Sequence, residues 1–369
     1  MLNSTDVFVA GGGPAGLAIA IAARQLGLRV VVADGAGAPI DKACGEGLMP
    51  DGIAALSKLG VTIPAGSSYA FRGVRFLSGC SSVDAAFPRG ESGLGIRRTV
   101  LHALMAEHAS QLGIECLWHT PVTGIFSDAV RLGSDTIRSK WIIGADGGNS
   151  SIRKWSGLAK FRTRDRRYAF RQHFRLAPWT DRMELHWGRP GEIYVTPVSE
   201  DQVCVALISR DPKLRLADAL PHFPELHERL CGVKPASSER GALTSTCKLR
   251  RVSRGRVALI GDASGTVDAI TGEGLCLAFS QAMVLAECLR NGDLARYEKE
   301  HRRLASRPLL MSRLMLMLDG RPRLQHRIMS VFRQRPQIFQ RLLELHVGAL
   351  SPFRLALDGL SLGWGLLTT

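Results

Sequence analysis

The stretch Gly11-Gly12-Gly13-Pro14-Ala15-Gly16 follows the apolar run DVFVA at 6–10 and precedes an alanine-rich segment that extends to about residue 26. A G-x-G-x-x-G pattern between a strand and a helix is typical of βαβ dinucleotide-binding units. Gly11 permits the tight turn, Gly13 lets the backbone approach a pyrophosphate, and Gly16 lets helix and strand pack closely. A second strand, RVVVA at 29–33, ends at Asp34, whose carboxylate can accept hydrogen bonds from a ribose. The sequence therefore predicts a Rossmann-type unit that binds a dinucleotide.

Length and composition indicate a globular chain with room for a second domain. The 369 residues are 45% hydrophobic and 22% charged, which suits two domains or one domain with an insertion. The sequence contains no run of eighteen apolar residues, and its start, MLNSTDVFVAGGG, lacks a basic region followed by an apolar signal core. We therefore expect a cytoplasmic protein without a membrane span.

Cysteine spacing and charge limit the classes of partner. The eight cysteines form no CxxC pair, so no zinc ribbon, dithiol motif or other metal site is predicted. The net charge is +15, and from Arg290 onward 14 Arg and Lys face 6 Asp and Glu, a balance of 14 − 6 = +8. Such a charge can attract nucleic acid, anionic membranes or acidic substrates. Because no aromatic-basic repeat accompanies it, we expect no nucleic-acid partner.

The rest of the chain alternates between two kinds of sheet. Helices are expected at 51–59, 98–112 and 274–290, and short strands at 114–118, 121–126, 129–132, 140–144 and 255–261. The segment 168–209 is instead typical of successive antiparallel strands, and 72–77 with 82–87 of a hairpin.

Two further glycine motifs follow buried strands. The first is GADGGNSSIR at 144–153, and the second is RVALIGDASG at 256–265 followed by DAITGEGL at 268–275. Glycines before a helix let the backbone touch a ligand and point its N–H groups at it. A plainer interpretation of the first motif is also open, in which Asp146 caps the next turn and Arg153 is a solvated helix residue.

The order and spacing of the three motifs resemble those of the para-hydroxybenzoate hydroxylase-type flavoproteins over roughly residues 5–290. The resemblance implies bound FAD, with Asp146 near the pyrophosphate and Asp262 on the ribityl chain. It also implies that the backbone of about 272–275 faces the flavin, although Ala269 stands where the family often has proline. By the same resemblance Arg97 reaches the flavin side of the cofactor, and the backbone at Val122 meets the adenine.

The loop KACGEGLMP at 42–50 resembles the CGxGL stretch of geranylgeranyl reductases and of some related monooxygenases. The resemblance implies that this loop lies along the flavin ring, where Cys44 can contact it. A small residue in a tight loop is the plainer interpretation of Cys44. The predicted cofactor-binding residues are Gly11, Gly13, Pro14, Ala15, Gly16, Asp34, Cys44, Gly45, Arg97, Val122, Asp146, Asp262, Gly272, Gly274 and Leu275.

The fold class expected is α/β, a Rossmann-type FAD-binding domain with an inserted antiparallel β substrate domain and a helical C-terminal region. The FAD-binding domain is predicted to comprise 1–160 and 245–290, and the substrate-binding sheet 161–244 with part of 71–94. A basic helical region is predicted at 291–369.

Only one Rossmann fingerprint is present, so NAD(P)H is expected to dock transiently as electron donor. This pattern resembles single-component hydroxylases, in which reduced flavin and dioxygen hydroxylate or epoxidise a hydrophobic small molecule. A reductase of isoprenoid or lipid double bonds remains open, and so does a non-enzymatic flavin-binding partner protein. A flavin halogenase is disfavoured, because the WxWxIP sequence of those enzymes is absent and Trp187 stands alone.

The substrate side is less specific than the cofactor side. Alternation puts Arg171, His173 and Arg175 on one face of a strand. The same alternation puts Glu184 and His186 on one face of a strand, and Tyr194 and Thr196 on one face of the next. His173, Glu184, His186 and Tyr194 are candidates for substrate contact, and no catalytic base is named.

The C-terminal region interleaves arginines with Leu, Met, Ile and Phe and is typical of amphipathic helices. Three roles are open for these helices. They can pack as a cap over the flavin domain, contact an anionic membrane peripherally, or bind a hydrophobic substrate.

Overall fold

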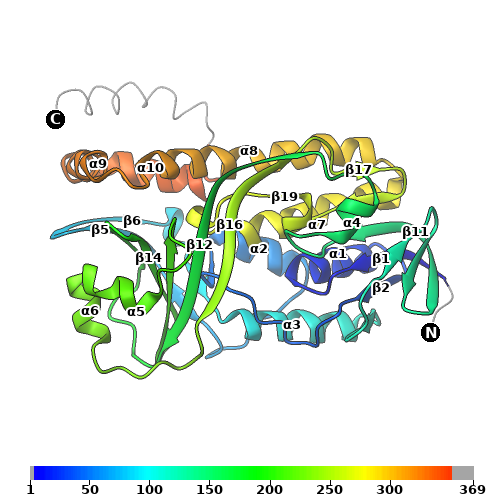
Figure 1. Cartoon of the computed structure of the whole chain (residues 1–369), viewed down its shortest axis with the longest axis horizontal. Helices are drawn as coiled ribbons and strands as arrows, with labels where there is room; N and C mark the ends of the chain where they lie inside the picture. The colour runs from blue at the N-terminus through cyan, green and yellow to red at the C-terminus, as the bar shows by residue number, and fades with distance from the viewer. Residues whose placement is uncertain (1–3, 351–369) are drawn as a thin grey trace.

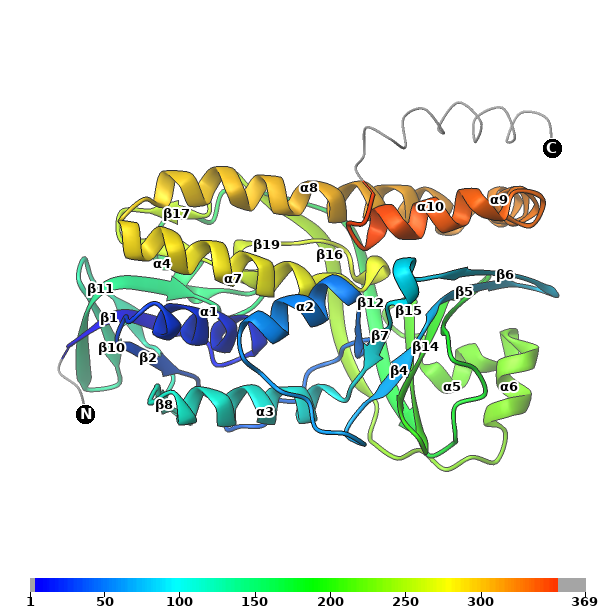
Figure 2. The ribbon, with the colours of Figure 1, turned by 180° about the vertical axis from the view of Figure 1, so that it is seen from behind.

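The computed structural model describes residues 4–350. The predictions for residues 1–3 and for the end of the helical region, 351–369, lie outside the described residues. The fold is mixed α/β, as predicted, and Figures 1 and 2 show two halves side by side, one that contains β1, β2 and β11 with helices packed on them and one that contains β5, β6 and β14. Within 4–350, no helix is both long enough and apolar enough to cross a membrane.

The first half is built on a mostly parallel sheet in the order β17-β18-β11-β1-β2-β8, with β10 and β9 attached to β11. Strands β1 and β2 flank helix α1, which gives the predicted βαβ unit. The strands are β1 Ser4–Ala10, β2 Val30–Ala33, β8 Glu115–Leu117, β9 Gly124–Ile125, β10 Ala129–Leu132, β11 Asp135–Gly144, β17 Ser253–Arg254 and β18 Val257–Leu259.

Helices pack against this sheet and against one another. Helix α1 contacts α3 and α7, and α7 also contacts α2 and α8. The first core is built from apolar residues such as Phe8, Ile19 and Ile142, which are fully buried. The helices are α1 Pro14–Gln25, α2 Pro50–Lys58, α3 Arg98–Gln111, α4 Ser151–Trp155 and α7 Gly274–Asn291, with the short 3₁₀ turns η1 Pro88–Gly90, η3 Gly261–Ser264 and η4 Ala269–Thr271.

The second half is a sheet in the order β19-β16-β12-β15-β14-β13-β5-β6, antiparallel except where β13 pairs with β5. The predicted hairpin joins it as its outer strands, and the predicted domain limit at 244–245 falls inside β16. The strands are β5 Gly73–Ser78, β6 Ser81–Ala86, β12 Phe161–Phe174, β13 Met183–Gly188, β14 Gly191–Ser199, β15 Gln202–Ser209, β16 Arg240–Leu249 and β19 Gly265–Thr266. A separate small sheet joins β3 Gly47–Leu48, β7 Gly93–Gly95 and β4 Tyr69–Phe71.

The second sheet is covered on both faces because successive side chains of a strand point to opposite sides. In β14, Ile193 and Val195 pack into the core under the small helices, while Tyr194 packs into the core under the C-terminal helices. The small helices are α5 Leu216–Ala219, η2 Leu220–His222 and α6 Pro224–Leu230. The C-terminal helices α8 Leu294–Leu318, α9 Pro322–Gln334 and α10 Pro336–His346 run from the first half across β5 and β6 (Figure 1). Helix α8 packs on α7 of the first half, as the expected cap over the flavin domain requires, whereas α9 and α10 pack on β5 and β6 of the second sheet instead.

Candidate functional site

The first glycine motif combines glycines that the protein itself requires with one that opens onto free space. A Cβ atom at Gly16 would lie 1.8 Å from the carbonyl oxygen of Gly11, so strand and helix could not approach as they do. At Gly13, no atom of the described chain lies within 4 Å of such a Cβ. Helix α1 starts at Pro14 without a side-chain cap among the described residues. Its unpaired N–H groups therefore face a space that suits a diphosphate.

Asp34 lies at the end of β2, where its carboxylate organises the turn around the motif. One oxygen accepts from the N–H of Gly12 at 2.7 Å and the other from the N–H of Ala36 at 2.7 Å. Each carboxylate oxygen keeps a second lone pair, so a ribose hydroxyl can still donate to it. Val122 is half-buried against the first core. The ribose and adenine contacts of these two residues remain predictions.

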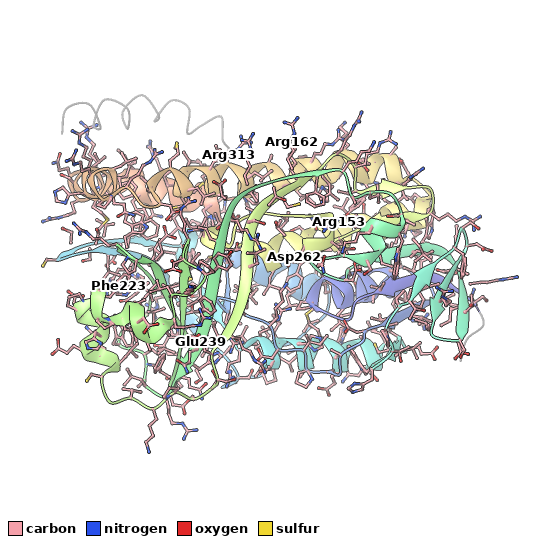
Figure 3. All side chains as sticks on the ribbon, in the orientation of Figure 1. Arg153, Arg162, Phe223, Glu239, Asp262 and Arg313 are labelled. Carbon is pink, nitrogen blue, oxygen red and sulfur yellow. The ribbon has the colours of Figure 1, made fainter. Side chains whose placement is uncertain are left out.

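The second motif uses both of its charged residues inside the protein. Asp146 accepts from the Ser150 hydroxyl at 2.5 Å and from the N–H groups of Ser151 and Ile152 at 2.7 and 3.1 Å. It therefore caps the start of α4, as the plainer interpretation expected. Arg153 is buried rather than solvated, and its guanidinium donates to the carbonyls of Ala263 at 3.2 Å and Gly148 at 2.5 Å. The solvated interpretation of Arg153 is wrong, because this side chain ties the second motif to the third (Figure 3).

The third motif supplies an exposed acid and a second free helix start. The side chain of Asp262 is 46% exposed and pairs with Lys42, Nζ to Oδ2, at 2.9 Å. Helix α7 begins at Gly274, and no side chain of the described chain caps it. At Gly272 and Gly274, an added Cβ would meet no described atom within 4 Å. Leu275 is half-buried against the first core. The residues present thus fit FAD, with one free helix start for the diphosphate and another beside the ring.

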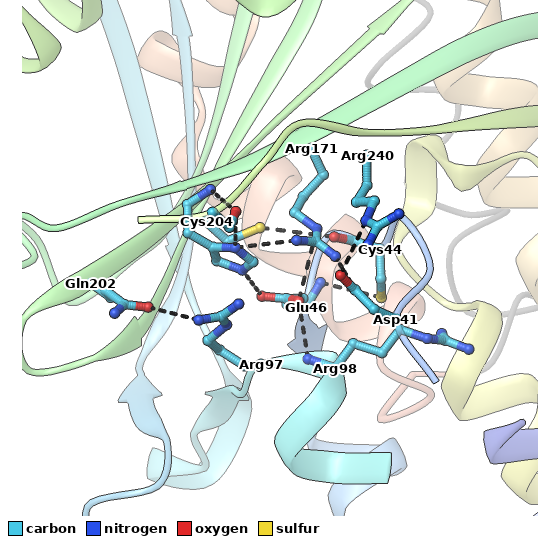
Figure 4. Close-up of polar contacts among 11 residues, drawn as sticks. Asp41, Cys44, Glu46, Arg97, Arg98, Arg171, Gln202, Cys204 and Arg240 are labelled. Carbon is cyan, nitrogen blue, oxygen red and sulfur yellow. Dashed lines mark hydrogen bonds and ion pairs between the residues drawn. The ribbon is translucent and has the colours of Figure 1, made fainter. Parts of the chain in front are cut away.

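The CGxGL loop carries a buried carboxylate that the sequence did not single out. Glu46 is 3% exposed, and it accepts from the N–H of Arg98 at 3.0 Å. Its other oxygen, Oε2, lies 2.6 Å from Nε2 of His173, a residue of strand β12. Figure 4 shows Glu46 among the charged residues of this cluster. Beside it, Cys44 is half-buried, and Gly45 has no described atom within 4 Å of an added Cβ.

The neighbours of His173 fix which ring nitrogen carries the hydrogen. Arg171 Nη1 lies 3.2 Å from His173 Nδ1, and a guanidinium can only donate. Nδ1 is therefore the acceptor and Nε2–H donates to Glu46. Ser237 Oγ, which accepts from the His173 backbone N–H, lies 2.9 Å from the same Nδ1 and can donate to it.

Further charged groups surround this Glu46–His173 pair. Arg171 also donates to Asp41 at 2.5 Å, and Arg240 pairs with the same carboxylate at 3.4 Å. Arg97 is half-buried and reaches Gln202 at 3.5 Å in the same cluster (Figure 4). The predicted contact between Arg97 and the flavin side of the cofactor remains a prediction.

Glu46, His173 and Cys204 each offer a ligand atom, and these atoms all lie within 4.8 Å of one another. A metal centre is nevertheless not the best description of the cluster. Burial raises the pKa of the Cys204 thiol well above its usual value, so the thiol stays protonated. The guanidinium of Arg171 lies against the same groups and would repel a cation. The cluster is therefore a hydrogen-bonded one.

An apolar cavity of about 490 Å³ lies between the second sheet and the C-terminal helices. Methionines contribute much of its lining, and their flexible thioethers adapt to irregular ligands. Its polar contributors are Tyr194, Thr271, Arg321, Arg341 and His346, and the apolar ones include Met49, Phe76, Met183, Leu185, Met315, Ile328, Phe332 and Phe339. The Tyr194 hydroxyl donates its hydrogen to the Ile270 carbonyl at 2.7 Å, so it cannot donate to a ligand at the same time.

Strand register places this cavity between two buried polar clusters on one sheet face. Glu192, Tyr194 and Thr196 alternate along β14, and Thr196 is opposite Cys204, which is opposite His173. The cavity lies at Tyr194, the Glu46 cluster lies at the Thr196 end, and a cluster around Arg167 lies at the Glu192 end.

Of the four polar residues predicted as candidates for substrate contact, only Tyr194 lines the large cavity. His173 is buried under the CGxGL loop. The predicted sharing of a face by Glu184 and His186 is confirmed, with 3.0 Å between His186 Nε2 and Glu184 Oε2, but the pair lines a separate small polar pocket.

Sequence reasoning missed Glu46, and it missed which helices would line the cavity. The left-handed backbone of Glu46 leaves no local signal in the sequence. The interleaved apolar residues of 296–346 did signal an apolar face, yet only the fold shows that this face covers the second sheet.

Residues 4–307 match the family model described as an FAD binding domain. The chain is 28% identical over 321 residues to menaquinone reductase of Mycobacterium tuberculosis, covering 80% of this chain and 78% of the relative. It is 25% identical over 348 residues to digeranylgeranylglycerophospholipid reductase of Methanocella arvoryzae, covering 84% and 86%. Rifampicin monooxygenase of Streptomyces venezuelae is 29% identical over 167 residues, covering 42% of this chain and 34% of the relative.

Two solved structures have the same fold. A flavoprotein/dehydrogenase from Cytophaga hutchinsonii superimposes with a TM-score of 0.81 at 18% identity, covering 94% of this chain and 93% of the other. A flavin-dependent brominase superimposes with a TM-score of 0.80 at 18% identity, covering 94% of both chains. At these identities the likeness establishes the fold alone.

Proposed function

This chain belongs to the family of FAD-binding domains, and we propose that it is an FAD-dependent reductase of carbon–carbon double bonds in an isoprenoid-like lipid chain. An FAD-dependent oxidoreductase is what the family match and the relatives share. The choice of reductase is our proposal. It is supported by the menaquinone and digeranylgeranylglycerophospholipid reductases, which match most of this chain.

One observation carries the proposal: both segments that would hold the flavin ring continue into the apolar cavity. Met49, which closes the CGxGL loop, and Thr271, which precedes Gly272, line the cavity wall. A ring between these segments would face the inner end of a long apolar space. An isoprenoid chain can bury its surface there without leaving polar groups unpaired.

The residues of this chain would position the two reactants. The free helix starts at Gly13 and Gly274 would bind the anionic parts of FAD, which supplies a hydride when reduced. The cavity walls would exclude water from the alkene. NAD(P)H is the donor we expect to dock transiently.

Monooxygenation of a hydrophobic small molecule is the second candidate. The match to rifampicin monooxygenase favours it, although that match covers less than half of this chain. The same cavity would then hold the carbon atom that receives oxygen.

One experiment separates the two reactions. The purified, FAD-loaded protein is reduced and mixed with a geranylgeranyl lipid under nitrogen, and in parallel with the lipid and ¹⁸O₂. A gain of two hydrogen atoms per double bond under nitrogen, read by mass spectrometry, supports the reductase. Incorporation of ¹⁸O, with no product under nitrogen, supports the monooxygenase and overturns the reductase.

A further inference from the structure

The Glu46 cluster contains an unbroken row of hydrogen-bonding atoms that the proposed function does not explain. Ser237 Oγ lies 2.9 Å from Nδ1 of His173, and Nε2 of His173 lies 2.6 Å from Oε2 of Glu46. His173 is fully buried and Glu46 almost so, whereas Ser237 is half-buried near the protein surface. The row therefore leads from the rim of the sheet to the loop that the proposed function puts beside the flavin.

The backbone at Glu46 is held in an unfavourable conformation. Its φ is 59°, in the left-handed region where glycine is the usual residue. Glycines flank it on both sides, yet the carboxylate occupies this position. Such strain is kept where the surrounding structure and the function demand that side chain.

We propose that Ser237, His173 and Glu46 form a proton path that carries solvent protons to the flavin-facing end of the cavity. The inference rests on the proposed function, which places the flavin beside Gly45 and the alkene beyond it. Glu46 is the inner end of the path, in the loop that the proposed function puts beside the flavin, and His173 and Ser237 act through it.

The proposed reaction needs such a path. For each double bond, a hydride with its two electrons reaches one carbon from the reduced cofactor, and one proton must reach the other carbon. Glu46 first takes the Nε2 proton of His173, while Nδ1 takes the hydroxyl proton of Ser237 and Ser237 takes one from water. Glu46 then releases its proton toward that carbon. His173 is then left with its proton on Nδ1, and a half-turn of the ring brings that N–H to the Glu46 side for the next transfer, so the net change is one proton moved inward.

Infrared spectroscopy tests the path without any substrate. The FAD-loaded protein is reduced electrochemically, and the reduced-minus-oxidised spectrum is recorded in H₂O and D₂O. We expect a protonated carboxyl band that shifts in D₂O and disappears in Glu46→Gln. If Glu46→Gln retains the band, or if no band forms in the wild type, the path is wrong.

A kinetic test uses a matched pair of histidines. His173→Gln should slow flavin-dependent alkene reduction about 100-fold, in the range expected for a lost proton-transfer group. His186→Gln removes the other histidine that faces a buried glutamate on this sheet, at 3.0 Å, and should change the rate little. Equal slowing in both variants would overturn the path.

Ser237→Ala guards against a folding defect in His173→Gln, because it removes only a half-buried hydroxyl. It should slow the reaction and increase the solvent isotope effect; a wild-type rate and isotope effect contradict the path. The two ideas fail separately. If the Glu46-dependent infrared band forms but no double bond is reduced, the proposed reductase function is wrong and the proton path stands. If the double bond is reduced but no Glu46-dependent band forms, the proton path is wrong and the reductase function stands.

Discussion

Arg167 and Glu192 are both completely buried, and Nη1 of Arg167 lies 3.3 Å from Oε2 of Glu192. Arg167 also donates to Asp268, just before η4, and lies near Asp319 at the end of α8. One guanidinium thus joins the sheet to the segment before Gly272 and to the helices that cover the cavity. It compensates carboxylates that are buried.

Replacing Arg167 should therefore destabilise the protein strongly. Arg167→Met leaves two buried carboxylates unpaired, which we expect to cost about 3–5 kcal/mol of unfolding free energy. Arg210→Met is the matched control, because Arg210 pairs with Asp319 at 2.7 Å but its side chain is 56% exposed. Because the Arg210 side chain stays largely in solvent and only one carboxylate, Asp319, loses a partner, Arg210→Met should cost clearly less than Arg167→Met. Urea unfolding of both variants decides, and equal losses would contradict this role for Arg167.

The glycine motif gives a prediction that separates folding from cofactor binding. Gly13→Ala should leave the FAD-free protein about as stable as the wild type, because the added Cβ meets no described atom within 4 Å and φ is −67°. FAD should bind much more weakly, since that Cβ enters the space proposed for the diphosphate. Gly16→Ala should instead unfold or distort the protein, because its Cβ would lie 1.8 Å from the Gly11 oxygen.

Thermal melting without FAD and flavin-fluorescence titration test this pair. If Gly13→Ala binds FAD as tightly as the wild type, the diphosphate does not lie against the start of α1.

The nucleotide-binding half was largely predictable, because its signals are local. Glycine spacing, apolar strands and the acid at Asp34 all lie within one βαβ unit, and the predicted strand at 6–10 is β1 Ser4–Ala10. Alternation also placed Arg171 and His173 on one face, where they touch.

The site could not be completed from sequence, because its contacts join distant segments. Glu46 meets His173 across 127 residues, and only the pairing of β12 with β15 sets which residues lie under the loop. The roof of the cavity comes from residues such as Phe332 and Phe339, whose helices look in sequence like any amphipathic cap. For Arg153, the sequence allowed a solvated charge, but the side chain is buried and joins the second motif to the third.

Glu273 predicts an effect of pH on stability. It lies between Gly272 and Gly274, is 2% exposed, and burial raises its pKa to about 8. Its charged and titratable neighbours are Arg307, Asp51 and His346. In the unfolded chain its pKa is about 4.3. Between about pH 4.3 and 8 the folded state therefore holds a proton that the unfolded state has lost, and the unfolding free energy falls as pH rises.

Glu273→Gln cannot titrate, so its unfolding free energy relative to the wild type should increase as pH rises from about 5 to 8. The exposed Glu91→Gln is the control, and its difference from the wild type should stay flat over the same range. Denaturant unfolding at several pH values measures both differences. A flat difference for Glu273→Gln would show that Glu273 is ionised throughout.

The basic surface over the apolar cavity predicts peripheral contact with an anionic membrane. Arg313, Arg323 and Arg327 project from the exposed side of α8 and α9, while the opposite side of these helices lines the cavity. Arg313 lies on the outer edge of the molecule in Figure 3. A lipid substrate could then reach the cavity from a membrane held by these charges. Each basic residue near an anionic surface is worth about 1 kcal/mol.

Flotation with vesicles of neutral and of acidic lipids at low salt tests this contact. The wild type should float with acidic vesicles only, and Arg323→Glu with Arg327→Glu should abolish flotation. The control is Lys213→Glu with Lys234→Glu, an equal charge change at exposed residues flanking α5 and α6, on the other side of the second sheet. It should leave flotation intact, because those lysines would face away from the bilayer. A wild type that stays in solution with acidic vesicles, or two double variants that behave alike, would show that the C-terminal helices serve only as a cap over the cavity.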